Sequence, residues 1–331
     1  MRIAVTGSIA TDHLMRFPGR FTDQLLPDQL HRVSLSFLVE DLEIRRGGVA
    51  ANICFGMARL GLTPVLVGAV GADFADYRSW LERHHVDCSA VHVSELQHTA
   101  RFLCTTDADH NQISSFYPGA MTEAREIELG PVAGRLGGLD LVVVAPNDPA
   151  AMARHTDECR ERGVPFVADP SQQLARMERD EIRELIDGAA YLFTNEYESA
   201  LVESKTGWTA AEILTRVDVR VKTLGSKGAL VERRGEPQIV VGCPAETVKA
   251  DPTGVGDAFR AGFLCGVAWQ VGLERAAQVG SLLATYVIET VGTQEYTFGA
   301  DEFVRRFAQA YGEAAAADVQ PHVHVPEPGH R

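Results

Sequence analysis

The sequence predicts an α/β protein whose central sheet is mostly parallel, with helices on both faces and a small β-sheet lid. Short apolar runs alternate with longer amphipathic segments, which is typical of parallel strands joined by helices. Two further segments alternate apolar and polar residues, as half-exposed strands do. Several apolar runs end in Gly, Asp or Asn, as strands do where they lead into ligand-binding loops. The runs expected in the central sheet are 2–8, 64–71, 139–146, 165–170, 189–195 and 219–225.

Helical patterns lie between several of these runs, and we expect them to cover the sheet. Segment 229–242 differs, because its two apolar stretches flank RRGE, which predicts a hairpin. The alternating segments 31–44 and 99–118 are expected to form the small separate sheet. The expected helices are 50–62, 148–163, 180–188 and 209–217.

Composition limits the classes of partner. The chain has 331 residues, 45% of them hydrophobic, and its 31 Lys and Arg against 45 Asp and Glu give a net charge of −14. Nucleic-acid affinity depends on Lys and Arg, so we expect no nucleic-acid binding. The six cysteines are scattered without a CxxC pair, which predicts free thiols in a reducing cytoplasm. The first residues resemble a strand rather than a signal peptide, and no apolar run has membrane-spanning length, so we expect no contact with a membrane.

The stretch DPTGVGDAF, residues 251–259, carries a chemical signal. Gly254 and Gly256 precede a helical pattern, so N–H groups would converge at a helix N-terminus and favour an anion such as phosphate. Asp257 could then accept the proton of a hydroxyl that attacks the phosphate. The alternative is a glycine turn in which Asp257 caps the helix, and the residues alone favour neither interpretation.

Two further motifs have a binding and a structural interpretation. The usual nucleotide motif GxxxxGK[ST] is absent from the sequence, so a nucleotide would need another cradle. TLGSKG, residues 223–228, ends a predicted strand and offers one, although a tight turn into the hairpin explains it equally well. Asn195 and Glu198, in NEYE, have the spacing of a helix N-cap, which by itself is enough to explain them.

Three motifs together resemble the ribokinase-like (PfkB) family of carbohydrate and nucleoside kinases. GGVAANICFGMARLG, residues 47–61, resembles the first signature of the family, NEYE its NxxE element, and DPTGVGDAF its second signature. Their order and the strand pattern over nearly the whole chain also fit. SIATDHL, DPSQQLARM and DPTGVGDAFRAGF resemble the bacterial adenosine kinases of that family. Pro252 and Val255 depart from the usual Thr and Ala but leave the Gly-x-Gly-Asp core unchanged.

The resemblance implies phosphoryl transfer from ATP. Asp257 would be the catalytic base on a sugar 5′-hydroxyl, with the backbone of Gly254, Val255 and Gly256 as the anion hole. Glu198 would organise Mg²⁺ through water, and the family also often uses a monovalent cation such as K⁺. The residues implied are Asn195, Thr223, Gly225, Ser226, Lys227 and Gly228 for ATP, and Asp251 for the monovalent cation.

The resemblance also implies a nucleoside site. Asp12 would bind the ribose hydroxyls, and Phe102 and Phe116 would hold the purine. Each has a structural alternative: Asp12 could cap a helix, either Phe could be a core residue, and Gly48 could only allow close packing. The residues implied for the substrate are Ser8, Asp12, Ser36, Gly48, Asn52, Phe102, Phe116, Gln172, Gln173 and Arg176.

These features predict one kinase domain over residues 1–317, with a lid formed by about 13–46 and 98–119 and a poorly ordered tail at 318–331. A homodimer is expected through 33–44, because the small strands would leave an apolar face and open edges. The predicted function is ATP-dependent phosphorylation of the adenosine 5′-hydroxyl to AMP, a purine-salvage reaction. Two alternatives stay open: a ribose or fructose kinase of the same family, and a non-catalytic nucleoside sensor on the same fold.

Overall fold

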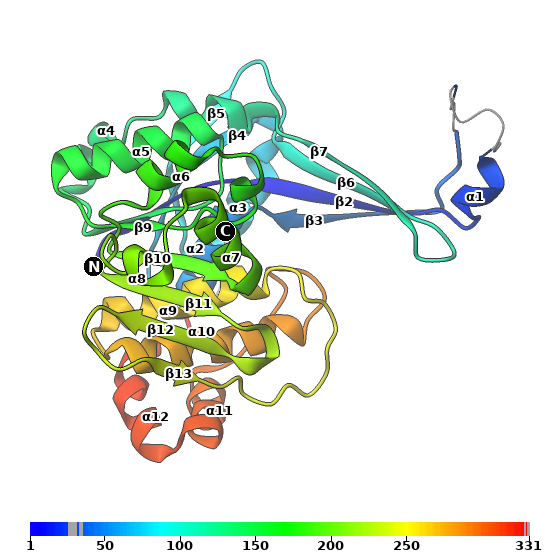
Figure 1. Cartoon of the computed structure of the whole chain (residues 1–331). Helices are drawn as coiled ribbons and strands as arrows, with labels where there is room; N and C mark the ends of the chain where they lie inside the picture. Colours follow the sequence, from blue (N-terminus) through cyan, green and yellow to red (C-terminus); the bar gives the residue numbers. More distant parts are fainter. Residues whose placement is uncertain (26–31, 33–35, 328, 330–331) are drawn as a thin grey trace.

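A nine-stranded sheet forms the centre of the molecule (Figure 1). The structure is a computed structural model that describes residues 1–25, 32, 36–327 and 329. The strand order is β13-β12-β11-β10-β9-β8-β1-β4-β5, and only the β11–β12 and β12–β13 pairs are antiparallel. All six predicted runs contain a strand, the predicted hairpin is β12–β13, and β5 was not predicted. The strands are β1 Ile3–Thr6, β4 Val65–Gly71, β5 Asp87–Ser94, β8 Leu141–Val144, β9 Phe166–Ala168, β10 Tyr191–Asn195, β11 Val219–Thr223, β12 Ala229–Arg233 and β13 Ile239–Val241.

Helices cover both faces of this sheet, because successive strand residues point to opposite sides. In β1, Ile3 and Val5 belong to one hydrophobic core and Ala4 to the other. This confirms the predicted class of a mostly parallel sheet between two helical layers. The helices on the Ile3 side are α2 Val49–Arg59, α3 Ala75–Arg83, α9 Val255–Trp269, α10 Leu273–Ile288, α11 Ala300–Tyr311 and α12 Glu313–Val319; those on the Ala4 side are α4 Leu129–Leu136, α5 Pro149–Arg162, α6 Arg179–Ile186, α7 Glu196–Thr206 and α8 Ala210–Ile213.

A second sheet of four strands, ordered β3-β2-β6-β7, extends from the body as an arm with the short helix α1 (Phe21–Gln24) beyond it (Figure 1). This confirms the predicted small separate sheet. In the predicted segment 31–44 the strand begins only at Asp41, residues 31 and 33–35 lie outside the described residues, and β2 was not predicted. The strands are β2 Ala10–Arg16, β3 Asp41–Gly47, β6 Ala100–Thr106 and β7 Gln112–Tyr117.

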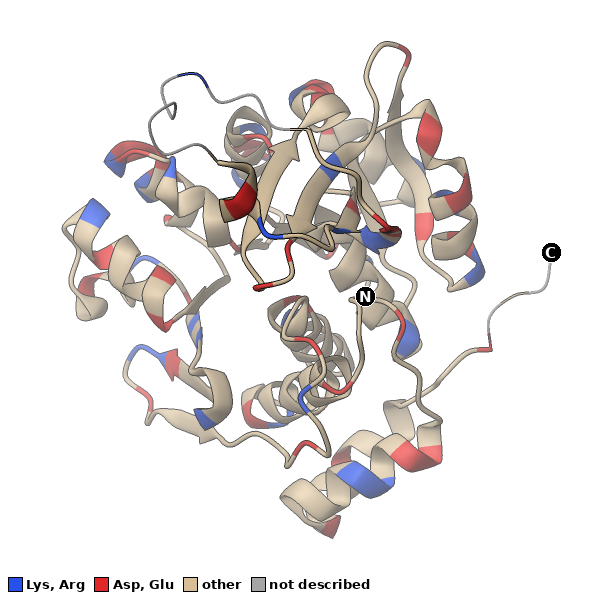
Figure 2. Ribbon diagram, turned by 90° about the vertical axis from the view of Figure 1, so that its right-hand side faces the viewer, with Lys and Arg blue, Asp and Glu red and all other residues tan. Residues whose placement is uncertain are grey.

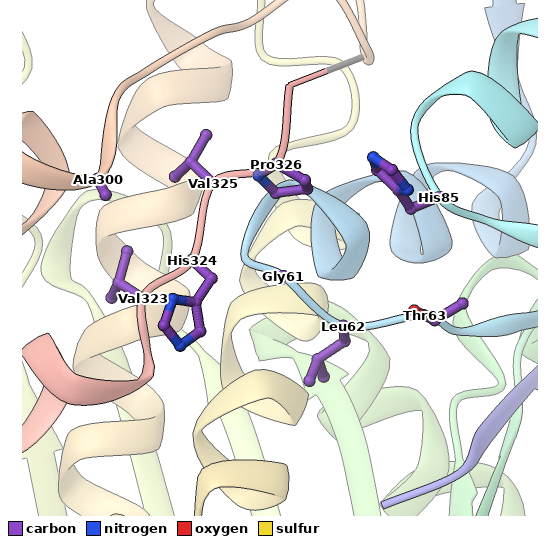
Figure 3. Close-up of a pocket in the computed structure, with 9 residues that line it drawn as sticks. All are labelled: Gly61, Leu62, Thr63, His85, Ala300, Val323, His324, Val325 and Pro326. Carbon is purple, nitrogen blue, oxygen red and sulfur yellow. The ribbon is translucent and has the colours of Figure 1, made fainter. Parts of the chain in front are cut away.

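The C-terminal segment differs from the poorly ordered tail that the sequence predicts. Val319 and Val323 are buried in the core that contains α2, and residues 323–326 pass alongside Gly61 and Leu62 (Figure 3). Gly61 has a φ of +92°, and a Cβ there would lie 2.5 Å from the His324 carbonyl oxygen. The prediction is wrong over residues 318–327, because the valines spaced between the Pro and His residues supply enough apolar surface to hold the segment.

The outer helices carry both basic and acidic residues, seen as blue and red segments mixed along them in Figure 2. Within the described residues, no helix combines the length and the apolar character needed to cross a bilayer.

Candidate active site

Two glycines at the N-terminus of α9 leave the first N–H groups of the helix uncovered by side chains. Gly254 has a φ of +77°, the left-handed conformation that favours glycine, and its N-cap position offers no side chain to the helix. Ala258 is the first residue whose N–H bonds back into the helix, to the Gly254 carbonyl at 2.9 Å. Of the predicted anion hole, the Val255 N–H already donates to the Pro252 carbonyl at 3.4 Å, whereas the N–H groups of Gly254 and Gly256, and that of Asp257, have no acceptor among the described residues. Free N–H groups at a helix start attract anions.

Asp257 lies where two cavities meet. The first, here called the lid-side cavity, has a volume of about 540 Å³ and is lined by the four-stranded sheet, α2 and the start of α9. The second, the hairpin-side cavity, has a volume of about 580 Å³ and is lined by the turn between β11 and β12, α7, α9 and α10. Asp257 lines both cavities, whereas Gly254 lines the first and Val255 and Gly256 line the second.

The surroundings of Asp257 suit a base better than a cap. Its Oδ2 accepts a hydrogen bond from Asn52 Nδ2 at 2.8 Å, and none of the described N–H groups of α9 donates to it. Burial raises the pKa of Asp257 to about 6, against the opposing effects of the Asn52 hydrogen bond and the Arg260 charge. A carboxylate with a pKa of about 6 is ionised at neutral pH and holds a proton more strongly than an ordinary Asp.

Arg260 is held beside the base by a buried ion pair that the sequence does not reveal. It lies one turn after Gly256 on α9, and its Nε and Nη2 each lie 2.6 Å from Asp169 at the end of β9. Asp169 is fully buried and Arg260 nearly so. The Nη2 hydrogen bond and the ion pair hold the guanidinium beside Asp169, so Arg260 supplies a positive charge near Asp257.

The register of the four-stranded sheet gathers three predicted substrate residues. Asp12 pairs with Phe102 across β2–β6, and Phe102 pairs with Phe116 across β6–β7. Directly paired residues point to the same face of a sheet, and all three line the lid-side cavity. Burial raises the pKa of Asp12 to about 6, against the opposing charge of Arg45. Asp12 lies within a strand, so the alternative of a helix cap is wrong.

Gly48 allows close packing of the backbone, as its structural interpretation holds, and it also lines the lid-side cavity. Its φ is +94°, and a Cβ there would lie 2.6 Å from the Ala10 nitrogen. Close packing therefore requires glycine. Ser36 is exposed and does not line the cavity, so the structure does not bring it to the other predicted residues. The predicted substrate residues that line the lid-side cavity are Ser8, Asp12, Gly48, Asn52, Phe102, Phe116, Gln172, Gln173 and Arg176.

The hairpin-side cavity brings together most of the residues predicted for ATP. Asn195 caps α7, accepting from the Glu198 N–H at 2.7 Å, while Glu198 accepts from the Asn195 N–H at 2.8 Å. The capping interpretation of NEYE is therefore confirmed, and both side chains still line the cavity. Lys227 does not line it; its exposed side chain lies 3.9 Å from Glu196. The predicted ATP residues that line the cavity are Asn195, Thr223, Gly225, Ser226 and Gly228.

The acidic side chains fit Mg²⁺ only through water and phosphate oxygens. Among the described residues, no three His, Cys, Asp or Glu side chains gather into a metal-binding cluster. Mg²⁺ in phosphoryl-transfer sites usually keeps several waters and uses one or two carboxylates, which Glu198 at the cavity wall can supply. Asp251 is already engaged: it accepts from the N–H groups of Thr253 and Gly292, and Arg45 lies 3.4 Å away. Its role toward a monovalent cation stays a prediction.

A buried network that the sequence does not reveal orients Asn52. Asn52 Oδ1 accepts from Thr293 Oγ1 at 3.0 Å and from Gln294 Nε2 at 2.9 Å. The Gln294 amide can only donate from Nε2, which identifies its partner as Oδ1, so Nδ2 of Asn52 is the group that faces Asp257. Gln294 Nε2 also lies 2.6 Å from the Tyr77 hydroxyl. No local signal marks these residues, because Gln294 is 242 positions from Asn52 in the chain.

Substituting Asn52 with Leu is expected to move the acid limb of the pH–rate profile to higher pH. The Asn52 N–H stabilises ionised Asp257, so its loss raises a pKa that is already about 6. A hydrogen bond to a charged group contributes about 1.5–3 kcal/mol, which corresponds to roughly one to two pH units. The measurement is kcat/KM between pH 5 and 9 for both proteins. An unchanged acid limb would show that Asn52 does not act on the base.

Two open cavities meet at a half-buried carboxylate and free helix N–H groups on a ribokinase-like fold, an arrangement that fits a kinase acting on an alcohol. The profile of the pfkB family of carbohydrate kinases matches residues 6–297, and the chain belongs to this family. The nucleoside kinase of Methanothermobacter thermautotrophicus is 31% identical over 288 residues, which are 86% of this chain and 92% of the relative.

Solved structures show the same likeness. The nucleoside kinase of Burkholderia thailandensis in complex with inosine is 34% identical, with a TM-score of 0.81 over 94% of this chain and 98% of that one. The nucleoside kinase of Methanocaldococcus jannaschii is 26% identical, with a TM-score of 0.80 over 93% of this chain and 99% of that one.

Proposed function

We propose that this kinase transfers the γ-phosphoryl group of ATP to the 5′-hydroxyl of adenosine and releases AMP, as a purine-salvage reaction of the cytoplasm. The observation that carries the proposal is the position of Asp257 in the wall shared by the two cavities. A base at that junction can reach a hydroxyl from one side and a phosphate from the other. The six unpaired cysteines, all but Cys243 buried, suit a reducing compartment.

In the proposed mechanism, the residues where the two cavities meet position both substrates and assist the transfer. The nucleoside occupies the lid-side cavity and ATP the hairpin-side cavity, so the γ-phosphate lies at the start of α9. Asp257 accepts the 5′-hydroxyl proton as the oxygen attacks. The N–H groups of Gly256 and Asp257 stabilise the charge on the transferred group. Glu198 would hold Mg²⁺ through water, and the ion would supply further neutralisation of phosphate charge.

The lid-side cavity has groups for each part of a nucleoside. Phe102 and Phe116 offer aromatic surfaces for a base, and Asp12 offers a carboxylate for the ribose hydroxyls. Gln173 Nε2 donates to the Asn147 carbonyl at 2.7 Å, which leaves its Oε1 as an acceptor for the 6-amino group of adenine. Inosine lacks that amino group. We further propose that the four-stranded sheet closes over the bound nucleoside and excludes water, which would otherwise hydrolyse ATP.

A panel of acceptors tests the substrate. Adenosine should give the highest kcat/KM among adenosine, guanosine, inosine, ribose and fructose in a coupled ADP-release assay. Higher kcat/KM with ribose or fructose would replace the nucleoside assignment with the sugar-kinase alternative. ADP release with none of the five acceptors would favour the non-catalytic sensor.

Both ions have testable consequences. Excess EDTA should abolish turnover, because the N–H groups at α9 cannot offset the full charge of ATP. Replacing K⁺ with choline at constant ionic strength should lower kcat if a monovalent cation binds near Asp251. Full turnover in EDTA would contradict the Mg²⁺ requirement, and equal rates in K⁺ and choline would contradict the monovalent site.

We propose that the protein forms a homodimer through the outer face of the four-stranded sheet. Leu42, Ile44 and Ile113 are 58%, 58% and 48% exposed and lie on the face opposite Asp12 by strand register. Such an exposed apolar face is typical of an interface. Val33, the first residue of the predicted interface, lies outside the described residues.

Sedimentation equilibrium at micromolar concentration should give about twice the chain mass of 36.0 kDa. Ile44→Glu would place like charges at the proposed interface and should shift the protein to monomer, whereas the exposed β12–β13 hairpin variant Glu236→Gln should remain a dimer. A 36.0 kDa species for the unaltered chain would contradict the proposal.

A further inference from the structure

We infer that a third cavity, between α2 and the C-terminal segment, binds a small organic anion through Arg59. This cavity, here called the α2–tail cavity, has a volume of about 430 Å³. None of its lining residues lines the lid-side or the hairpin-side cavity. It adjoins the pocket of Figure 3, with which it shares Ala300, Val325 and Pro326.

Arg59 is a buried cation without a counter-charge. Arg59 is only 6% exposed, and its Nε has no hydrogen-bond partner. The other guanidinium nitrogens make long contacts with neutral oxygens: Pro326 O at 3.4 Å, Phe298 O at 3.3 Å and Thr297 Oγ1 at 3.4 Å. No carboxylate among the described residues lies within ion-pair distance of it. A buried unpaired charge is unfavourable, and an anion in the cavity would remove that cost.

The positive charge around the cavity extends beyond Arg59. Burial lowers the pKa of His84 against the opposing hydrogen bond to the Trp80 carbonyl, and the nearby guanidinium groups of Arg59, Arg83 and Arg46 also lower it. Arg46 also lies over the Trp80 ring at 4.0 Å. A basic group of this kind within a chain of net charge −14 marks a local site for an anion.

Two carboxylates line the cavity but do not neutralise Arg59. Glu295 accepts from the Gln294 N–H at 2.9 Å and lies 4.0 Å from Arg46. Glu327 is exposed, and its carbonyl oxygen lies 3.1 Å from His85 Nε2. Neither carboxylate forms an ion pair with Arg59, whose hydrogen-bond partners among the described residues are all neutral oxygens, so its guanidinium remains available.

The lining of the cavity indicates the class of ligand. A planar guanidinium binds a carboxylate or a phosphate group through two parallel hydrogen bonds. Phe55, Trp80, Tyr296 and Phe298 supply apolar aromatic surface beside it. The volume falls in the range of small-molecule sites, about 300–1,000 Å³. The ligand is therefore one carboxylate or phosphate group carried on a small planar or apolar body.

Trp80 provides a direct readout, because it lines the cavity and is one of three tryptophans in the chain. A variant with Trp208→Phe and Trp269→Phe retains only Trp80. Benzoate and phenyl phosphate should each change its fluorescence saturably, whereas neutral benzyl alcohol should not.

Arg59→Met in the same background should weaken binding at least about tenfold, the loss expected for a hydrogen-bonded charge. Arg59→Lys, which keeps the charge without the planar fork, should also weaken it and serves if Arg59→Met does not fold.

A matched control separates this cavity from the active site. Phe102→Ala removes an aromatic ring from the lid-side cavity and should leave benzoate affinity unchanged. Equal affinity in the Arg59→Met and parent proteins, or no binding of either probe, would overturn the inference. Inorganic phosphate that binds as tightly as phenyl phosphate would overturn the assignment to an organic anion.

Discussion

Asp257→Asn is expected to lower kcat by a factor of about 10²–10⁴, the usual effect of removing a general base. The amide keeps the shape of the side chain but cannot accept the proton of the attacking hydroxyl. Substrate affinity should survive, because the cavities that meet at Asp257 are otherwise unchanged. A steady-state assay with ATP and adenosine, together with a nucleoside-binding titration, measures both effects. A kcat within about threefold of the unaltered enzyme would show that Asp257 is not the base.

The same substitution should not destabilise the fold. Burial raises the pKa of Asp257 to about 6 in the folded protein, above the value of an exposed Asp. The ionised carboxylate is therefore unfavourable above pH 6, and this cost disappears below about pH 4, where the group is protonated in both states. Asp257→Asn should leave Tm at pH 7.5 equal or higher. Asp301→Asn, in the first turn of α11, is a matched control that should leave kcat unchanged.

Asp12→Asn is expected to lower kcat/KM for adenosine by roughly 10- to 100-fold, because a charged group that holds hydroxyls contributes about 1.5–3 kcal/mol. The effect should depend on the hydroxyls themselves. The unaltered enzyme should prefer adenosine to 2′-deoxyadenosine, and the variant should lose most of that preference. Kinetics with both nucleosides measure it, and Asp41→Asn on neighbouring β3 is the control. A preference that survives Asp12→Asn would exclude Asp12 from the ribose site.

Local chemistry explains why part of the site could be predicted from the sequence. Gly254, Gly256 and Asp257 lie within four positions, so the helix that follows them fixes their relative placement. The same holds for Asn195 and Glu198, whose spacing alone sets a capping box. The strand and helix order was also predictable, because an apolar run buried on both sides differs clearly from an amphipathic segment.

Long-range placement could not be predicted. Asp12, Phe102 and Phe116 meet only because β2, β6 and β7 pair in one particular register, and a shift of one residue would point them to the other face. Asn52 reaches Asp257 and Gln294 across more than 200 positions. Ser36 and Lys227 show the converse: each has a suitable side chain, but the structure places neither in its predicted cavity.

In the proposed reaction a nucleoside 5′-hydroxyl receives the phosphoryl group of ATP at Asp257. Phosphorus NMR of a reaction with ATP, Mg²⁺ and adenosine observes the acceptor atom directly, since a 5′-phosphomonoester couples to the two 5′ protons. We expect one equivalent of this signal for each equivalent of ADP, and only the slow background in Asp257→Asn. ADP formed without the nucleoside 5′-phosphate, or an equal yield from Asp257→Asn, would contradict phosphoryl transfer at Asp257.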